Sequence, residues 1–196
     1  MKRSLGRRLV ATPSVVWIVG TFDRNDRPNL MAAAWAGICC SRPPCLAVSL
    51  REATYSYQAI LDRQAFSVNI PTAEQAEVAD YLGLASGRDV DKIAACGLTA
   101  TPSEHVDAPL VEEFPMSFSC ALIHTLKIGL HTLFVGEIRD VQADDVILNE
   151  ADRPILSMLN PLLFSAGEQR YYATGDAIGP AFEMGKKFLD DIDPLS

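Results

Sequence analysis

Short apolar runs dominate the chain, and residues that favour turns separate them. Alternating or continuous runs of Val, Ile, Leu, Phe and Thr, bounded by Gly, Pro, Asn or Asp, are typical of β-strands. The pattern predicts strands at residues 15–21, 46–50, 66–70, 116–127, 132–141 and 170–174. A further short strand is expected at residues 145–148, after a turn at residues 142–144.

Gly129 lies between the two longest runs, which predicts that residues 116–127 and 132–141 form an antiparallel hairpin. The stretch from Asn29 to Leu50 has a different character, because it reads NLMAAAWAGICCSRPPCLAVSL. It is too apolar for a surface loop and looks too rich in alanine for a sheet.

Helical patterns are fewer and gather in the middle of the chain. Thr72 and Gln75 form a capping box, and the apolar face that follows is expected to end at Gly83. A second helix is expected at residues 89–95, before a glycine, and a third begins near Thr54. Many strands with few helices predict a mainly β fold: a closed or nearly closed antiparallel barrel with peripheral helices.

Nothing in the composition divides the chain, so residues 1–196 are expected to form one domain. The N-terminal segment imitates a secretory signal, but Pro13 interrupts its apolar run and no small-residue cleavage site follows. No apolar segment reaches the ~20 residues that a membrane helix requires. A net charge of −8 argues against binding to nucleic acid or to an anionic membrane. An anionic ligand therefore needs a local positive pocket.

The five cysteines are odd in number and none is spaced CxxC, which suggests reduced thiols in the cytoplasm. A zinc site usually combines two pairs of ligands, and no second pair at ligand spacing accompanies Cys39, Cys40 and Cys45. We therefore expect no metal site there. They are better interpreted as small apolar side chains.

Two polar clusters could hold an anion. In SLREATYSY, Arg51 follows a predicted strand and hydroxyl residues surround a predicted helix start, which is a suitable cradle for a phosphate. The alternative is an ordinary helix cap with a solvated arginine. In SGRDVDK, Gly87 permits close approach, and Arg88 and Lys92 are expected to share a helical face. A surface turn balanced by Asp91 is the alternative there.

The motifs together resemble the flavin reductase-like family of FMN-binding split β-barrels. The resemblance rests on NLMAAAW, SRPP, REATYSY, FSVNIP, ADYLGLASGRDVDK, GLT, HTLFVGEI and YYATGDAIGPAFEMGK, in order over residues 13–187. Within the family the chain is most similar to flavoredoxin and its close relatives. The resemblance implies a cofactor site made by Asn29, Met31, Ala34, Trp35, Cys39, Cys40, Ser41, Ser49, Arg51, Thr54, Asn69, Lys92, His131 and Phe164.

Each part of the flavin has an expected partner by this resemblance. Three successive alanines at 32–34 are expected to keep one wall of the flavin slot thin, and Trp35 is expected to lie beside the ring. Backbone groups of residues 39–41 are expected to meet the pyrimidine edge of the ring. A redox role for the two cysteines of that segment stays open. Asn69 is expected to contact the ribityl chain or the ring edge.

The phosphate and the closure of the pocket have expected partners too. The residues expected to contact the phosphate and the ribityl chain are Ser49, Arg51, Thr54 and Lys92. His131 and Phe164 would close the pocket from the partner subunit of a homodimer; from the residues alone, each is equally interpretable as a satisfied core or edge side chain.

The resemblance implies an FMN-dependent oxidoreductase that passes reducing equivalents from NADH or NADPH to a flavin or another small acceptor. The flavin carries the chemistry, so no catalytic residue beyond it is expected. The alternative is a flavoredoxin-like electron carrier with tightly bound FMN and no nicotinamide substrate. A third possibility is a barrel that binds another planar ligand or serves as an interaction module.

Overall fold

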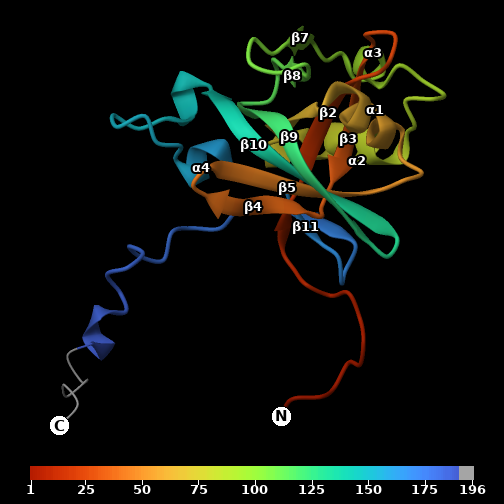
Figure 1. Cartoon of the computed structure of the whole chain (residues 1–196). Helices are drawn as coiled ribbons and strands as arrows, with labels where there is room; N and C mark the ends of the chain where they lie inside the picture. The colour runs from red at the N-terminus through yellow and green to blue at the C-terminus, as the bar shows by residue number, and fades with distance from the viewer. Residues whose placement is uncertain (190–196) are drawn as a thin grey trace.

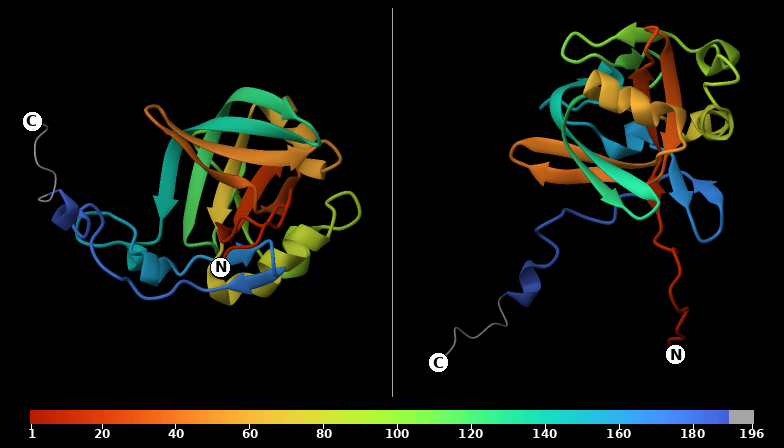
Figure 2. Two further views of the ribbon diagram at one scale, coloured as in Figure 1. Left: turned by 90° about the horizontal axis from the view of Figure 1, so that it is seen from below. Right: turned by 45° about the vertical axis from the view of Figure 1, so that its right-hand side comes forward.

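One antiparallel sheet organises the computed structural model, which describes residues 1–189. Its strand order is β3-β2-β6-β9-β10-β5-β4. The sheet curls into a barrel that stays split between its two edge strands, β3 and β4 (Figure 2). The strands are β2 (Trp17–Phe22), β3 (Pro28–Ala33), β4 (Ala36–Ser41), β5 (Pro44–Arg51), β6 (Ala65–Ile70), β9 (Met116–Ile128) and β10 (His131–Ala143).

Smaller elements surround this barrel (Figure 1). Two small sheets consist of β1 (Ser14–Val15), β11 (Leu163–Ser165) and β12 (Arg170–Tyr172), and of β7 (Ala100–Pro102) and β8 (Pro109–Val111). The α-helices are α1 (Tyr55–Arg63), α2 (Ala76–Leu84), α3 (Lys92–Cys96) and α4 (Leu156–Leu159). Short 3-10 helices are η1 (Ala73–Gln75), η2 (Asp145–Ile147) and η3 (Lys186–Phe188). The expected fold class, a mainly β split barrel with peripheral helices, is confirmed.

Both faces of β2 are buried, which explains its continuous apolar sequence. Val19 points into the barrel, where it joins Phe66 and Phe134 in the main core. Ile18, on the opposite face of the strand, packs with Leu82 of α2 in a second core outside the barrel. The helices α2 and α3 thereby cover the side of the sheet formed by β2 and β3.

Most expected strands are present. The hairpin is confirmed, since β9 and β10 pair antiparallel around Gly129, whose φ is +55°. The first strand is interrupted at Val16, so it forms β1 and β2. The strand expected at residues 145–148 is wrong, because the backbone N–H groups of Ile147 and Leu148 donate to Asp144 and Asp145 and close a 3-10 turn.

The alanine-rich stretch belongs to the sheet, so the expectation that it contains too much alanine for a sheet is wrong. It forms β3 and β4, and Ala32 and Ala33 pair with Ile18 and Trp17 of β2. The small side chains have a packing reason: a Cβ built on Gly83 of α2 would lie 3.4 Å from the Ala32 Cβ. A helix can therefore lie close against this strand.

The helices also differ from expectation in their bounds. Gly83 does not end α2, which continues to Leu84. The helix expected at residues 89–95 begins only at Lys92, because the Asp91 carboxylate caps it by accepting from the Ile93 and Ala94 backbone N–H groups. Arg88 therefore precedes the helix, and the helical face it was expected to share with Lys92 does not exist. None of the helices in residues 1–189 is long and apolar enough to cross a membrane.

Candidate functional site

The N-terminus of α1 offers backbone N–H groups that no side chain of the helix cap satisfies. Thr54 is the N-cap residue, but its hydroxyl donates to the Arg51 carbonyl at 2.8 Å and makes no capping bond. Arg88 reaches the same turn, where it donates to the Ala53 carbonyl at 3.0 Å and lies 5.6 Å from the centre of the Tyr55 ring. Arg88 and the free helix N–H groups thus face one place, and Arg51 lies in the turn that leads into the helix, an arrangement that suits an anion.

Neither arginine is neutralised by a carboxylate. Among residues 1–189, the ion pairs involve other basic side chains, and Arg51 and Arg88 form none. Both side chains belong to exposed residues, so they are free to meet a ligand from solution. This local positive site stands in a chain whose net charge is −8.

The end of β5 brings several predicted site residues to the same place. Ser49 and Arg51 share the outer face of β5, because side chains alternate along a strand and the neighbouring Val48 and Leu50 point into the core. His131 lies directly opposite Arg51 in the β5–β10 ladder. The Ser49 N–H donates to the Trp35 carbonyl at 2.8 Å, which anchors the start of β4 beside this face.

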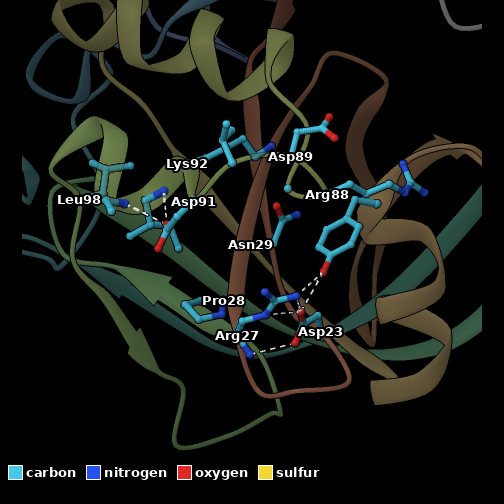
Figure 3. Close-up of a pocket in the computed structure, with 14 residues that line it drawn as sticks. Asp23, Arg27, Pro28, Asn29, Arg88, Asp89, Asp91, Lys92 and Leu98 are labelled. Carbon is cyan, nitrogen blue, oxygen red and sulfur yellow. Dashed lines mark hydrogen bonds and ion pairs between the residues drawn. The ribbon is translucent and has the colours of Figure 1, made fainter.

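A polar cleft with a volume of ≈ 460 Å³ continues from the α1 N-terminus (Figure 3). Asn29 stands in its wall and donates to the Ser56 hydroxyl at 2.9 Å. Gly87 is required here: a Cβ at this position would lie 2.1 Å from the Asn29 Oδ1 and 2.8 Å from the Tyr55 ring. The cleft has the size of a small-molecule site, and only glycine lets the 86–91 loop lie against its wall.

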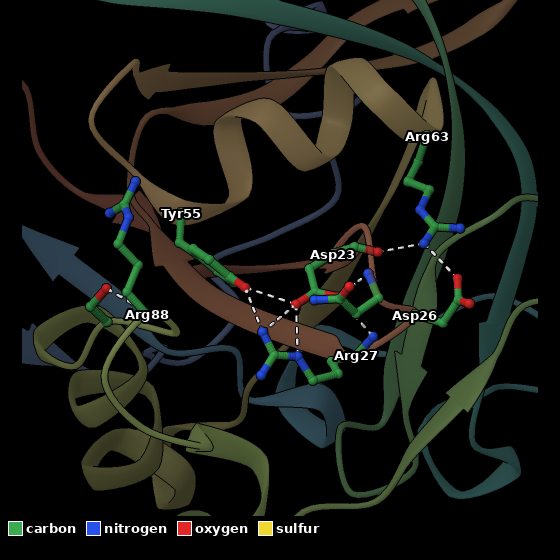
Figure 4. A network of polar contacts seen from close by, with 8 residues as sticks. Asp23, Asp26, Arg27, Tyr55, Arg63 and Arg88 are labelled. Carbon is green, nitrogen blue, oxygen red and sulfur yellow. Dashed lines mark hydrogen bonds and ion pairs between the residues drawn. The ribbon is translucent and has the colours of Figure 1, made fainter.

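A network of charges fixes the turn beneath the cleft (Figure 4). Arg27 pairs with Asp23 at 2.8 Å, and the Tyr55 hydroxyl donates to the same carboxylate at 2.8 Å. Burial alone would raise the pKa of Asp23, but bonds from the Arg27 and Asn25 backbone N–H groups and from the Tyr55 and Arg27 side chains lower it to about 2. The charge of Arg27 is therefore largely offset inside the network.

Arg63 extends this network to the opposite side of the turn. Its guanidinium bridges Asp26 and Asp107 and also donates to the backbone carbonyl of Asp23. Because Arg63 is the last residue of α1, it ties the helix to the β2–β3 turn. The positions of α1 and of the cleft are thus coupled.

Lys92 is placed differently from the other predicted phosphate ligands. Only 4% of its surface is exposed, and its ammonium donates to the carbonyls of Leu82 and Ala85 at 3.1 and 3.2 Å. Burial lowers its pKa to about 8. Lys92 lines the cleft on the side opposite Asp23 and Arg27 (Figure 3) and caps the C-terminus of α2, where a cation also complements the helix dipole. Its contact with a phosphate stays a prediction.

Asn69 has no hydrogen-bonding capacity left for a ligand, because groups in the core already occupy its side-chain amide. Its amide group donates to the Ile18 carbonyl and the Ser67 hydroxyl, both at 3.1 Å. Its carbonyl accepts from the Val111 N–H at 3.1 Å and the Ser117 hydroxyl at 2.7 Å. Every polar atom of the side chain is occupied, so the predicted contact with the ribityl chain or the ring edge finds no support.

The remaining predicted residues lie on β3, on β4, between these two strands or on β11. Ala34 and Phe164 line an apolar cavity of ≈ 360 Å³ between α2, β3 and the β11–β12 hairpin, whereas Met31 is half-buried against the barrel core. Cys39 and Ser41 are exposed and Cys40 is half-buried on the edge strand β4. Within residues 1–189, one side of this strand has no neighbour in the sheet, so its backbone N–H and C=O groups are open to a ligand.

The sequence reasoning missed two members of the cleft. Tyr55 and Arg27 line it together with Arg88, yet their shared partner Asp23 lies 32 residues from Tyr55 in the chain. A partnership at that separation leaves no local pattern. Gly87 and Arg88, by contrast, belong to SGRDVDK, a segment whose glycine and two basic residues already mark it in the sequence as a possible anion site.

Known proteins share this architecture. The flavoredoxin of Desulfovibrio vulgaris (Miyazaki F) is 49% identical, with a TM-score of 0.90 over 94% of this chain and 100% of that one. An FMN-binding protein from Thermus thermophilus is 25% identical, with a TM-score of 0.78 over 92% of this chain and 97% of that one. The reductase component of an FADH(2)-dependent resorcinol hydroxylase from Rhizobium sp. is 26% identical over 79% of this chain and 80% of its own.

Other relatives are matched less completely. Three archaeal proteins that are 27–31% identical are matched over 50–68% of their own length. A family model described as a flavin reductase like domain matches residues 8–173 of this chain. That range contains the α1 N-terminus, the cleft and both edge strands of the barrel. The chain therefore belongs to the family of flavin reductase like domains.

Proposed function

We propose that the protein is an FMN-dependent oxidoreductase that passes reducing equivalents from NADH or NADPH to a flavin or another small acceptor. The observation that carries the proposal is the uncapped N-terminus of α1, with Arg88 beside it and Arg51 in the turn that leads into it. Membership in the family supports flavin-related redox chemistry. The Thermus thermophilus protein, described as FMN-binding, supports FMN as the flavin.

The residues present suit this cofactor. The phosphate of FMN carries nearly two negative charges, which two arginines and free helix N–H groups can match. Trp35 supplies an apolar plane at the start of β4, and the open edge of that strand supplies donors and acceptors for a polar ring edge. When bound, FMN supplies hydride and electron transfer.

The chain itself then has the tasks of binding and orientation. Arg51 and the α1 N-terminus hold the anionic end, and Asn29 and Gly87 shape the cleft beside it. His131 lies opposite Arg51 in the β5–β10 ladder. A proposed role for residues 39–41 is to position the ring through their backbone. No side chain is required to act as a general base in this proposal.

A homodimer is part of the same proposal. Large apolar side chains are exposed on the β9–β10 hairpin, on β4 and on residues 173–189, here called the C-terminal arm; they include Leu126, Leu130, Ile38, Ile178 and Phe182. Phe182 is 96% exposed and Ile178 is 91% exposed. Exposed apolar groups of this size favour burial in a partner. We propose that a second copy supplies it, that the flavin lies near that interface, and that the protein acts in the cytoplasm.

The second candidate function is an electron carrier, which the 49% identity to a flavoredoxin favours. Mixing the FMN-loaded protein with NADH or NADPH distinguishes the two. Bleaching of the flavin absorbance on the timescale of turnover supports the oxidoreductase. Absence of bleaching with both nucleotides, together with reduction by dithionite, would leave the carrier as the better account.

A further inference from the structure

Three of the five cysteines gather on the β4–β5 hairpin, and two of them face each other. Cys40 is the direct cross-strand partner of Cys45 in this antiparallel ladder. A register shift between Ile38 and Cys40 leaves Cys39 as the extra residue. Directly opposed residues in antiparallel strands place their side chains on one face with Cα atoms roughly 4.5–5.5 Å apart, within the range that a disulfide spans.

The thiols differ in accessibility. Cys40 is half-buried, whereas Cys45 is 2% exposed and donates to the Pro43 carbonyl at 3.3 Å. Burial raises the pKa of Cys45, and the neighbouring Cys40 and Cys39 thiols raise it further. All five cysteines are free thiols in the structure. Cys40 can therefore be reached from solution, while Cys45 can be reached only from within the hairpin.

We propose that Cys40 and Cys45 form a redox-active dithiol that closes into a cross-strand disulfide when a low-molecular-weight disulfide oxidises it. The Cys40 thiolate attacks one sulfur of the oxidant; that S–S bond breaks, one small thiolate leaves, and a mixed disulfide forms on Cys40. The Cys45 thiolate then attacks the Cys40 sulfur and expels the second small thiolate. Two electrons pass from the protein to the oxidant, and the two thiol protons end on the released small thiols.

The position of the pair gives it a connection to the site. Residue 45 lies on the same face of β5 as Ser49 and Arg51, because it is separated from them by even numbers of residues. A disulfide there would cross-link β4, whose backbone is proposed to meet the flavin ring. That connection rests on the proposed function, but closure of the dithiol does not.

Cys39 is the competing partner, because its thiol donates to the Cys45 carbonyl at 3.6 Å. Trypsin does not cleave before proline, so Arg27 and Arg42 stay uncut and residues 25–51 form one tryptic peptide with all three cysteines. Full-length protein is reduced, treated with oxidised glutathione, alkylated and digested. We expect this peptide to carry one alkylated cysteine and to lack the mass of two hydrogens.

Single variants identify the pair. Cys39→Ser should still close, whereas Cys40→Ser and Cys45→Ala should yield no closed peptide; Cys96→Ser, on α3, is the matched control and should behave as wild type. Closure should also become faster as the pH rises, because both thiols must ionise. The proposal is overturned if Cys39→Ser abolishes closure, if Cys45→Ala still closes, or if the wild-type peptide never closes. These readouts need no flavin, so a failure to bind FMN would leave them unaffected.

Discussion

Single side chains decide the electrostatics of the cleft. Asp23 offsets Arg27 and holds Tyr55, while Lys92 is held by the carbonyl end of α2. Arg51 and Arg88 are left with their charges available. An acidic protein can therefore present a positive site, because Asp23 and Asp91, two of the carboxylates that line the cleft, are engaged with Arg27 and with the N-terminus of α3.

Asp23→Asn tests the network below the cleft. The pKa of this carboxyl falls from 3.8 to about 2 on folding, so ionised Asp23 stabilises the protein by about 2 kcal/mol at neutral pH. The contribution is complete above pH 3.8 and is lost as the pH falls through about 2. Urea unfolding should show the variant weaker by about that amount at pH 7 and nearly equal to wild type at pH 2. An equal difference at both values would contradict the assignment.

Arg51→Ala and Arg88→Ala test the anion site. Each removes a charged donor at the α1 N-terminus and should raise the dissociation constant of FMN by roughly tenfold, or ~1.4 kcal/mol. Riboflavin, which lacks the phosphate, should bind the variants and the wild type alike. Arg139→Ala is the control, since that side chain pairs with Glu137 on β10. Unchanged FMN binding in both variants would mean that the phosphate lies elsewhere.

At the scale of elements, local patterns predicted most strands but, apart from the β9–β10 hairpin, not their partners. The hairpin follows from two strand patterns around Gly129, and the helix that begins near Thr54 follows from apolar residues at helical spacing. The strand β3 was missed because alanine has low strand propensity, and its packing against α2 is not visible in its own residues. The hydrogen bonds that occupy Asn69 are invisible for the same reason, since three of its four partners, Ile18, Val111 and Ser117, come from distant segments.

Gly136→Ala tests how tightly β10 is packed. A Cβ there would lie 2.6 Å from the Phe66 ring and 2.8 Å from the Cys120 Cβ. We expect a loss of about 1–3 kcal/mol in the free energy of unfolding, since the core must shift to admit a methyl group. Gly37→Ala on β4 is a matched control with no heavy atom within 4 Å of the new Cβ, and it should unfold like wild type. Equal stability of both variants would contradict the prediction, because it would mean that the core admits the methyl group at Gly136 without a cost in free energy.

At the scale of the whole molecule, the exposed apolar arm bears on assembly. Ile178 and Phe182 are almost fully exposed, and they belong to the C-terminal arm, which leads away from the barrel in Figure 1 and in the right-hand view of Figure 2. If a second copy buries them, Ile178→Ser/Phe182→Ser should shift the mass measured by light scattering from dimer toward monomer. A control exchange of Leu84, which is 78% exposed on α2, should leave the mass unchanged. A dimer of undiminished strength in the arm variant would exclude this contact.

The central claim is that the α1 N-terminus and its two arginines hold FMN through its phosphate. Titrating the flavin-free protein with FMN and following flavin fluorescence tests this most directly. The account predicts a saturable change at one FMN per chain and binding at least about tenfold tighter than that of riboflavin. A titration without saturable change, or one in which riboflavin binds as tightly as FMN, would contradict it.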